Sequence, residues 1–182
     1  MGFIKFFKEL YAFGKLMKEL PGQIEQQNQV YRAISASDLA ALPDEDLFAA
    51  AQSRTEACLD AREFDALSHP QQVFIVVNTL EMEVNNGGLC QFFVNSSRNY
   101  APYVSGSLAE IGAEAHKTLF DRFIHRRGID LNDLSSFQIQ RIKDFEKQVK
   151  RYPFDEYDDR FYELPSLEEP LTRYIRDNLN AF

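Results

Sequence analysis

The segment from Gln71 to Asn86 constrains the fold more than any other, because it is apolar on nearly every side. It contains the run Val73-Phe74-Ile75-Val76-Val77, and apolar residues return at Leu80 and Val84. The run alone fits a β-strand as well as a helix, but the pattern continues for about sixteen residues, far beyond a usual strand. We therefore expect a helix, and a helix that is apolar all round lies in the middle of its domain.

Further helical patterns fill the rest of the 182 residues, and almost no stretch alternates at period two. The sequence predicts an all-α fold, a single compact multi-helix bundle around the buried central helix. The other expected helices cover residues 2–20, 23–34, 44–64, 91–93, 107–127, 136–152 and 171–179. Pro21-Gly22 is expected to end the first helix. No repeat or low-complexity linker divides the chain, so we expect an N-terminal helix over residues 1–20 and one domain over residues 21–182.

Cysteine usage and hydropathy bear on the compartment. Cys58 and Cys90 lie 32 positions apart, with no CxxC spacing, which indicates two small core thiols in a reducing environment. No apolar run approaches the roughly 18 to 20 residues that span a bilayer, and no signal peptide is recognisable. We expect a cytoplasmic protein.

The formal net charge of −8 is spread unevenly. Residues 38–65 hold eight acids against two bases, and residues 153–169 hold seven acids against one, so each segment carries −6. Residues 116–151 hold nine bases against five acids, which gives +4. A negative field repels nucleic acid and attracts basic partners, and salt weakens it. The charge pattern predicts a basic protein partner and no direct contact with nucleic acid.

A dense group of carboxylate, amide and aromatic residues surrounds a double glycine. Asn86-Gly87-Gly88 fits the end of a helix, because glycine readily adopts the left-handed conformation. Glu81 and Asn85 are four residues apart and are expected to face a polar seam with Gln91 and Asn95. The structural hypothesis is that Glu81 ties loop N–H groups to the helix. The alternative, a general base, needs a proton donor that no neighbouring histidine supplies.

The three histidines do not suggest a metal site. His116 and His125 are nine residues apart on one predicted helix, which places them on opposite faces. His69 is expected to cap a helix. We therefore expect neither a metal nor another cofactor.

Two motifs carry a family resemblance. The first runs from Glu81 to Tyr100, and the second is Tyr152-Pro153-Phe154-Asp155-Glu156-Tyr157-Asp158-Asp159-Arg160-Phe161-Tyr162. Together they resemble a bacterial family of helical domains whose named member is a DNA mimic, a protein that offers carboxylates in place of phosphates to a DNA-binding regulator. The resemblance covers residues 30–182. It implies an all-helical cytoplasmic domain without known catalysis, in which the first motif is structural and is not itself the mimicking surface. The motif residues are Glu81, Asn85, Asn86, Gly87, Gly88, Gln91, Phe92, Phe93, Asn95 and Tyr100.

Two groups of acids are the candidates for contact with a partner. Glu56, Asp60 and Glu63 are spaced to form one stripe on a helix, about 4.5 to 6 Å apart along its axis, which is of the order of the charge spacing in DNA. The second group is Asp155, Glu156, Asp158 and Asp159. The competing interpretation is a solvated face that only confers solubility.

The first twenty residues form a strongly amphipathic pattern. Phe3, Phe6, Phe7 and Leu10 belong to one arc, and lysines with two glutamates occupy the other. Such an apolar face needs a cover, which is the core of the domain, a second copy or a membrane surface. Four lysines opposed by two acids favour the core or a dimer over the membrane.

The predicted function is a non-catalytic acidic protein-binding domain, a DNA mimic that occupies a basic DNA-binding regulator. One alternative is an immunity-like or regulatory module without mimicry. The other is a small enzyme that uses Glu81 as a general base.

Overall fold

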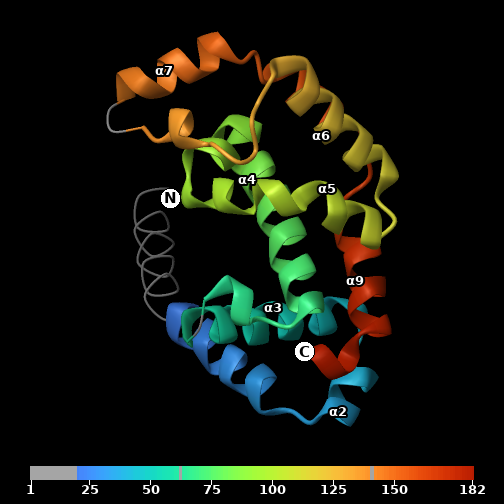
Figure 1. The fold of residues 1–182 in the computed structure, drawn as a ribbon. Helices are drawn as coiled ribbons and strands as arrows, with labels where there is room; N and C mark the ends of the chain where they lie inside the picture. Colours follow the sequence, from blue (N-terminus) through green and yellow to red (C-terminus); the bar gives the residue numbers. More distant parts are fainter. Residues whose placement is uncertain (1–19, 62, 140–141) are drawn as a thin grey trace, which may run out of the picture.

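The computed structural model describes residues 20–61, 63–139 and 142–182, and every regular element within these ranges is a helix (Figure 1). The prediction of an all-α fold is confirmed. After a helix over residues 20–33, the elements are α2 (Ala36–Ala41), α3 (Asp44–Ala61), α4 (His69–Val94), α5 (Ala101–Glu110), α6 (Glu114–Arg127), α7 (Ile142–Arg151), α8 (Asp155–Tyr162) and α9 (Glu168–Asp177). Short 3-10 turns are η1 (Phe64–Ala66), η2 (Ser96–Tyr100), η3 (Ser135–Phe137) and η4 (Leu179–Ala181).

Helix α4 is the central element, as predicted. It runs through the middle of the molecule, with α3 at its lower end and α5 and α6 near its upper end (Figure 1). Val73, Phe74, Val77 and Leu80 are at most 2 % exposed, because α3, α5, α8 and α9 all pack against this helix. Removing this much apolar surface from water is the main stabilising term for such a bundle.

The start of α4 is fixed by a capping box. The Ser68 hydroxyl accepts a hydrogen bond from the Gln71 N–H at 3.3 Å, and the Gln71 side chain accepts one from the Ser68 N–H at 3.2 Å. These bonds satisfy N–H groups that have no partner inside the helix. The prediction that His69 caps this helix is wrong. Ser68 does so, while the His69 ring contacts Glu110 at 2.9 Å.

Aromatic side chains fill the core at the upper end of α4. Phe93 stacks on Phe137 with ring centroids 4.7 Å apart and meets Phe92 edge to face at 5.5 Å. Both cysteines are free thiols, Cys90 buried and Cys58 half-buried. Burial raises the pKa of the Cys90 thiol to about 11, and Asp158 adds to the rise, so this thiol stays protonated at neutral pH.

Several predicted boundaries are wrong. Pro21 and Gly22 are helical, because single residues of low propensity weigh against a helix without forbidding it. The segment 107–127 forms two helices, since Gly112 adopts a left-handed φ of 76° just after α5. The helix expected over residues 136–152 begins later, as α7. Residues 155–162, where no helix was predicted, are helix α8.

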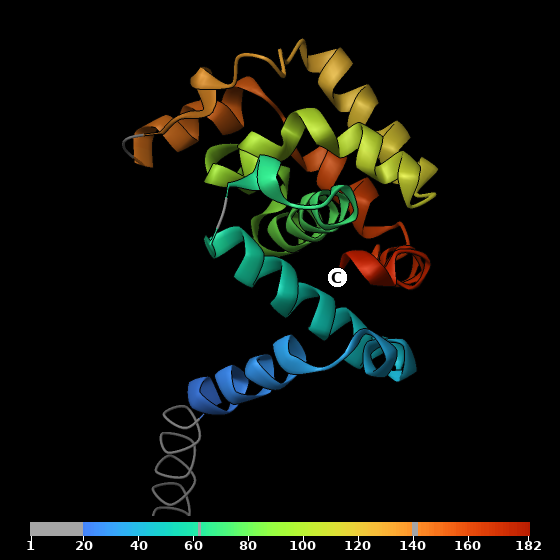
Figure 2. The same cartoon turned by 60° about the horizontal axis from the view of Figure 1, so that its bottom comes forward.

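The helix over residues 20–33 lies beside α3 and apart from the upper half of the molecule (Figure 2). Arg54 of α3 donates a hydrogen bond to the Tyr31 carbonyl at 2.8 Å, and Tyr31 is the buried residue of this helix. Leu20, Ile24 and Val30 are exposed. The amphipathic helix predicted for residues 2–20 otherwise lies outside the described residues, and its cover stays a prediction. Within the described ranges, none of the helices combines the length and apolarity that crossing a membrane requires.

Candidate functional site

The double glycine bends α4. Gly87 has φ −163° and ψ 25°, and Gly88 has φ 75° and ψ 173°, so neither residue continues the helix. The predicted interruption at Asn86-Gly87-Gly88 is therefore present as a kink between two parts of one long helix. A kink breaks the regular bonds between each N–H and the carbonyl four residues earlier. Polar backbone groups at the kink need other partners.

Helix α8 supplies two of these partners. The Asp158 carboxylate accepts a hydrogen bond from the Leu89 N–H at 2.8 Å, after the kink. The Tyr162 hydroxyl donates to the Val84 carbonyl at 2.7 Å, before the kink. Asp158 and Tyr162 are four residues apart on α8, so one face of this helix contacts both sides of the bend. The two sequence motifs thus form one structural unit.

The Asp158 carboxyl group is half-buried. Burial raises its pKa to about 6, the hydrogen bond from Leu89 opposes that rise, and the neighbouring Asp155 and Asp159 add to it. Tyr162 and the buried Tyr157 and Cys90 are the other titratable groups around it. The group was predicted to face a partner. Its position makes it part of the support for the kink instead.

We expect the stability of the protein to depend on pH through Asp158. With a folded-state pKa near 6 and an ordinary value of 3.8 in the unfolded chain, the folded state binds more protons between these values. Its contribution to the free energy of unfolding is therefore complete below pH 3.8 and is lost as pH rises through about 6. Urea unfolding of the wild type and Asp158→Asn across this range measures the effect as the difference between the two curves.

Asp158→Ala is the second variant to be compared in that experiment. Asparagine retains an acceptor for the Leu89 N–H, whereas alanine leaves this N–H unpaired, which costs about 1 to 2 kcal/mol. We expect Asp158→Asn to be at least as stable as the wild type at pH 7, and Asp158→Ala to be less stable. Equal stability of the two variants would contradict the role of Asp158 as the acceptor for the Leu89 N–H.

A second carboxylate, Glu83, bridges the two parts of α4. It accepts hydrogen bonds from Gln91 at 2.6 Å, from Asn95 at 3.0 Å and from Ser97 at 2.9 Å. The prediction placed Glu81 and Asn85 in this polar seam, which is wrong. Asn85 and Asn86 are exposed, and their side chains make no hydrogen bond to the part of the chain that the structure describes.

Glu81 lies on another side of α4 and holds the start of α9. One carboxylate oxygen accepts a hydrogen bond from the Leu167 N–H at 2.8 Å and from the Ser166 hydroxyl at 3.0 Å. This is the kind of contact that the structural hypothesis described. Tyr100, the last residue of the first motif, packs on Phe64 with ring centroids 5.1 Å apart.

His116 and His125 lie on different faces of α6, as their spacing predicted. His116 is buried edge-on against Phe161, and burial lowers its pKa, while His125 is exposed. Among the described residues, no three or more His, Cys, Asp or Glu side chains form a group that could hold a metal ion.

The first group of candidate acids forms a shorter stripe than predicted. Glu56 is half-buried and accepts a hydrogen bond from Gln52 at 2.8 Å, and Asp60 is exposed one turn later. Helix α3 ends at Ala61, so Glu63, which is also exposed, lies beyond the helix at the start of η1. The regular spacing therefore holds for two carboxylates and not for three.

The second group is divided among different surroundings. Asp155 and Asp159 are exposed and lie four residues apart on α8. Glu156 forms ion pairs with Arg126, Arg127 and Arg160. Since Asp158 supports the kink, two of the four acids remain available to a partner.

The two groups lie on elements that face different neighbours. Helix α3 packs against α2, α4 and α9, whereas α8 packs against α4 and α6. The acidic segments do meet elsewhere, at a hollow of about 410 Å³ that is bordered by Asp44, Glu168 and Glu169 together with Arg173 and Arg176. Asp44 forms an ion pair with Arg176 across this hollow. Glu168 and Glu169 belong to the acidic segment 153–169 noted in the sequence, but nothing in the sequence indicated that they lie beside Asp44 at the start of α3.

Comparison with known proteins gives one family. A search of curated proteins and a search of solved structures returned no match. A family model described as DMP19-like protein matches residues 65–178, which include both motifs, the kink and the helix that supports it. This agrees with the resemblance to DNA-mimic proteins read from the two motifs. The match covers more than half of the chain, and the chain belongs to the DMP19-like protein family.

Proposed function

We propose that this protein is a non-catalytic binding domain whose exposed carboxylates occupy the DNA-binding face of a basic regulator. Membership in the DMP19-like family supports a role as a DNA mimic. The observation that carries the proposal is the exposure of the candidate acids. Five of the seven point to solvent or lie half-exposed without an ion pair among the described residues, and they are Glu56, Asp60, Glu63, Asp155 and Asp159.

The geometry of α3 suits a surface that binds DNA-binding proteins. Glu56 and Asp60 are one helical turn apart, about 6 Å along the axis. Phosphates on one DNA strand follow each other at about 3.4 Å along the helix axis. One carboxylate per helical turn therefore gives a row of negative charges that is more widely spaced than the phosphates of DNA. Because exposed charges are screened by salt, such a contact weakens steeply as ionic strength rises.

The enzymatic alternative has no support from the surroundings of Glu81. Its carboxylate binds the Leu167 N–H and the Ser166 hydroxyl, which gives it a structural role at the start of α9. The module without mimicry differs from our proposal in one measurable respect, competition with DNA.

The test is competition for a DNA-binding protein. A DNA-binding protein captured from the native host would be purified, and its affinity for its own DNA duplex measured by fluorescence anisotropy with increasing amounts of this protein. We expect displacement of DNA at about 50 mM KCl and much weaker displacement at about 200 mM. Binding to the regulator without any loss of DNA would instead identify a regulatory module without mimicry.

A charge-matched pair of variants locates the contact. Glu56→Gln/Asp60→Asn/Glu63→Gln is expected to raise the concentration needed for half-displacement by about tenfold or more, since close charge pairs contribute more than 1 kcal/mol each. Glu114→Gln/Glu146→Gln/Asp177→Asn removes the same charge from exposed positions on α6, α7 and α9 and is expected to change it less than about twofold. Equal losses in both variants would show that net charge alone acts, without a defined surface.

A further inference from the structure

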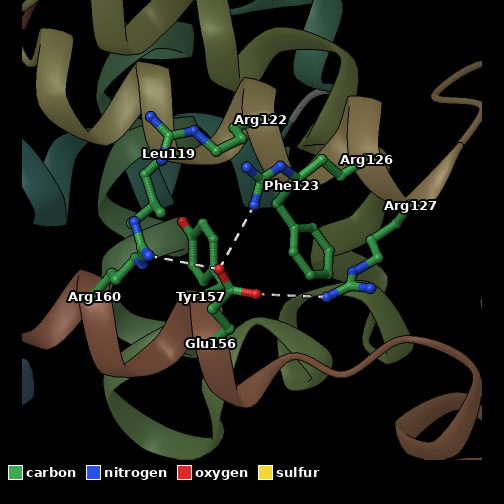
Figure 3. Close-up of a pocket in the computed structure, with 8 residues that line it drawn as sticks. All are labelled: Leu119, Arg122, Phe123, Arg126, Arg127, Glu156, Tyr157 and Arg160. Atoms are coloured by element: carbon green, nitrogen blue, oxygen red, sulfur yellow. Dashed lines mark ion pairs between the residues drawn. The ribbon is translucent and has the colours of Figure 1, made fainter.

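A pocket between α6 and α8 concentrates positive charge in a chain that is acidic overall. Four arginines line it, Arg122, Arg126 and Arg127 from α6 and Arg160 from α8 (Figure 3). Its apolar wall consists of Leu119, Phe123 and Tyr157. Arg126 and Arg127 follow Arg122 by four and five residues, about one helical turn, and the packing of α8 against α6 brings the guanidinium of Arg160 to the same pocket.

One carboxylate balances these charges incompletely. Glu156 lies 3.7 Å from Arg126, 3.8 Å from Arg127 and 3.6 Å from Arg160. Each of these distances exceeds that of a good hydrogen bond, and the Glu156 side chain is 54 % exposed, so the pairs are loose. Arg122 makes no ion pair with the described residues. With four arginines and one glutamate, the lining has a net charge of +3.

The same pocket holds two donors without acceptors. The Tyr157 hydroxyl is buried in a side chain that is 2 % exposed, and no partner for it exists among the described residues. The Nε of Arg127, whose guanidinium lies 5.8 Å from the centre of the Phe123 ring, is buried and unpaired as well. Buried polar groups in folded proteins nearly always have a partner. Two such donors in one arginine-lined pocket favour a ligand that is rich in acceptor oxygens.

We propose that this arginine pocket binds a small ligand through a phosphate group. A phosphate dianion presents several oxygens, and guanidinium forks bind such oxygens with paired hydrogen bonds. A carboxylate ligand would offer only two oxygens to these four arginines, and the pocket already contains the carboxylate of Glu156. The proposal concerns α6 and α8 cations, so it stands independently of the acidic surface on α3.

The dimensions of the pocket suit this ligand. The inner cavity has a volume of about 20 Å³, and a cavity needs roughly 10 to 15 Å³ to hold one water-sized group. One phosphate oxygen therefore fits beside Tyr157. A hollow of about 330 Å³ adjoins the cavity and shares Leu119, Arg122 and Arg160 with it, which leaves space for the remainder of the ligand.

Titration calorimetry of the full chain tests the proposal with two probes, inorganic phosphate and glycerol 3-phosphate, at an ionic strength held constant with KCl. We expect a Kd below about 1 mM for at least one of them. Tighter binding of glycerol 3-phosphate indicates a monoester ligand, and binding of inorganic phosphate alone indicates the free ion. No heat of binding from either probe at concentrations up to about 10 mM would overturn the proposal.

Variants separate this site from general charge. Arg122→Gln/Arg160→Gln is expected to weaken phosphate binding by at least about tenfold, because two charge-assisted contacts are lost. Arg173→Gln, an exposed arginine of α9, is the control and is expected to leave the affinity unchanged. Equal affinities for all three proteins would show that phosphate binds elsewhere.

Tyr157→Phe gives a readout that a purely structural role would not produce. Removing an unpaired buried hydroxyl is expected to leave the Tm unchanged or higher, while phosphate affinity falls by about fivefold to tenfold because one donor to the anion is lost. A lower Tm with unchanged phosphate affinity would mean that the hydroxyl serves only the fold, and the assignment of Tyr157 to the site would be wrong.

Discussion

Replacement of Gly88 by alanine is expected to lower the free energy of unfolding by about 3 kcal/mol or more. Gly88 has φ 75° and ψ 173°, a combination that residues with a side chain hardly ever adopt. A Cβ atom at this position would also lie 2.3 Å from the Asp158 carboxylate, the group that binds the Leu89 N–H. Thermal unfolding measures the effect, with an expected fall in Tm of roughly 10 °C.

Two other glycines separate the causes of this loss. Gly106 lies inside α5 with no heavy atom near its Cβ position, so Gly106→Ala is expected to stabilise the protein by about 0.5 to 1 kcal/mol. Gly112 has φ 76° and an equally open surrounding, so Gly112→Ala experiences backbone strain without a clash and is expected to cost about 1 to 2 kcal/mol. Gly88→Ala experiences both.

A double variant isolates the clash. If the contact with Asp158 contributes to the loss, Gly88→Ala should cost less in a chain that already carries Asp158→Ala, because the atom that the new Cβ meets is absent. Identical costs in both backgrounds would assign the whole effect to the backbone conformation. A Gly88→Ala protein as stable as the wild type would contradict the kink itself.

The central helix and its interruption were predictable because both depend on local chemistry. An apolar pattern that covers all sides requires burial, and two adjacent glycines after Asn86 favour an end or a bend whatever surrounds them. Whether the chain stops or bends there depends on α8, some seventy residues later, which supplies acceptor and donor to the broken helix. No local pattern carries that information.

The roles of Glu81 and Glu83 show the same limit. Two residues apart on a helix, they point about 200° away from each other. The sequence indicated a carboxylate among the amides Gln91 and Asn95, but the kink rotates the second part of α4 relative to the first, so the periodicity of a straight helix selects the wrong glutamate. Glu83 meets the amides, and Glu81 meets α9.

The second group of candidate acids is divided among different surroundings because of how α8 packs. The spacing of Phe154, Tyr157 and Phe161 is compatible with one buried helical face, and the acids between them then point in several directions. Asp158 meets α4 and Glu156 meets the α6 arginines, which leaves Asp155 and Asp159 exposed. The sequence shows the excess of basic residues in 116–151. It does not show that the arginines of α6 lie beside Arg160, because that depends on the packing of α8 on α6.

Truncation of Phe93 to alanine is expected to cost about 3 to 5 kcal/mol, the usual loss for a buried phenylalanine. The ring is fully buried, stacks on Phe137 and meets Phe92 edge to face, so its removal leaves a cavity that these neighbours fill only partly. Tyr103→Ala removes an aromatic side chain that is 46 % exposed and should cost less than about 1 kcal/mol. Urea unfolding compares the two variants.

The milder Phe93→Leu variant then separates folding from binding. It keeps most of the apolar volume, so the protein should remain folded at 25 °C although its Tm falls. Because Phe93 lies in the core and the exposed acids lie on α3 and α8, this variant should displace DNA from the regulator as well as the wild type does. The triple acid variant should show the opposite behaviour, an unchanged Tm with weakened displacement. A folded Phe93→Leu protein that no longer displaces DNA would mean that the family motif contacts the partner directly, and the division between a structural motif and an acidic binding surface would be wrong.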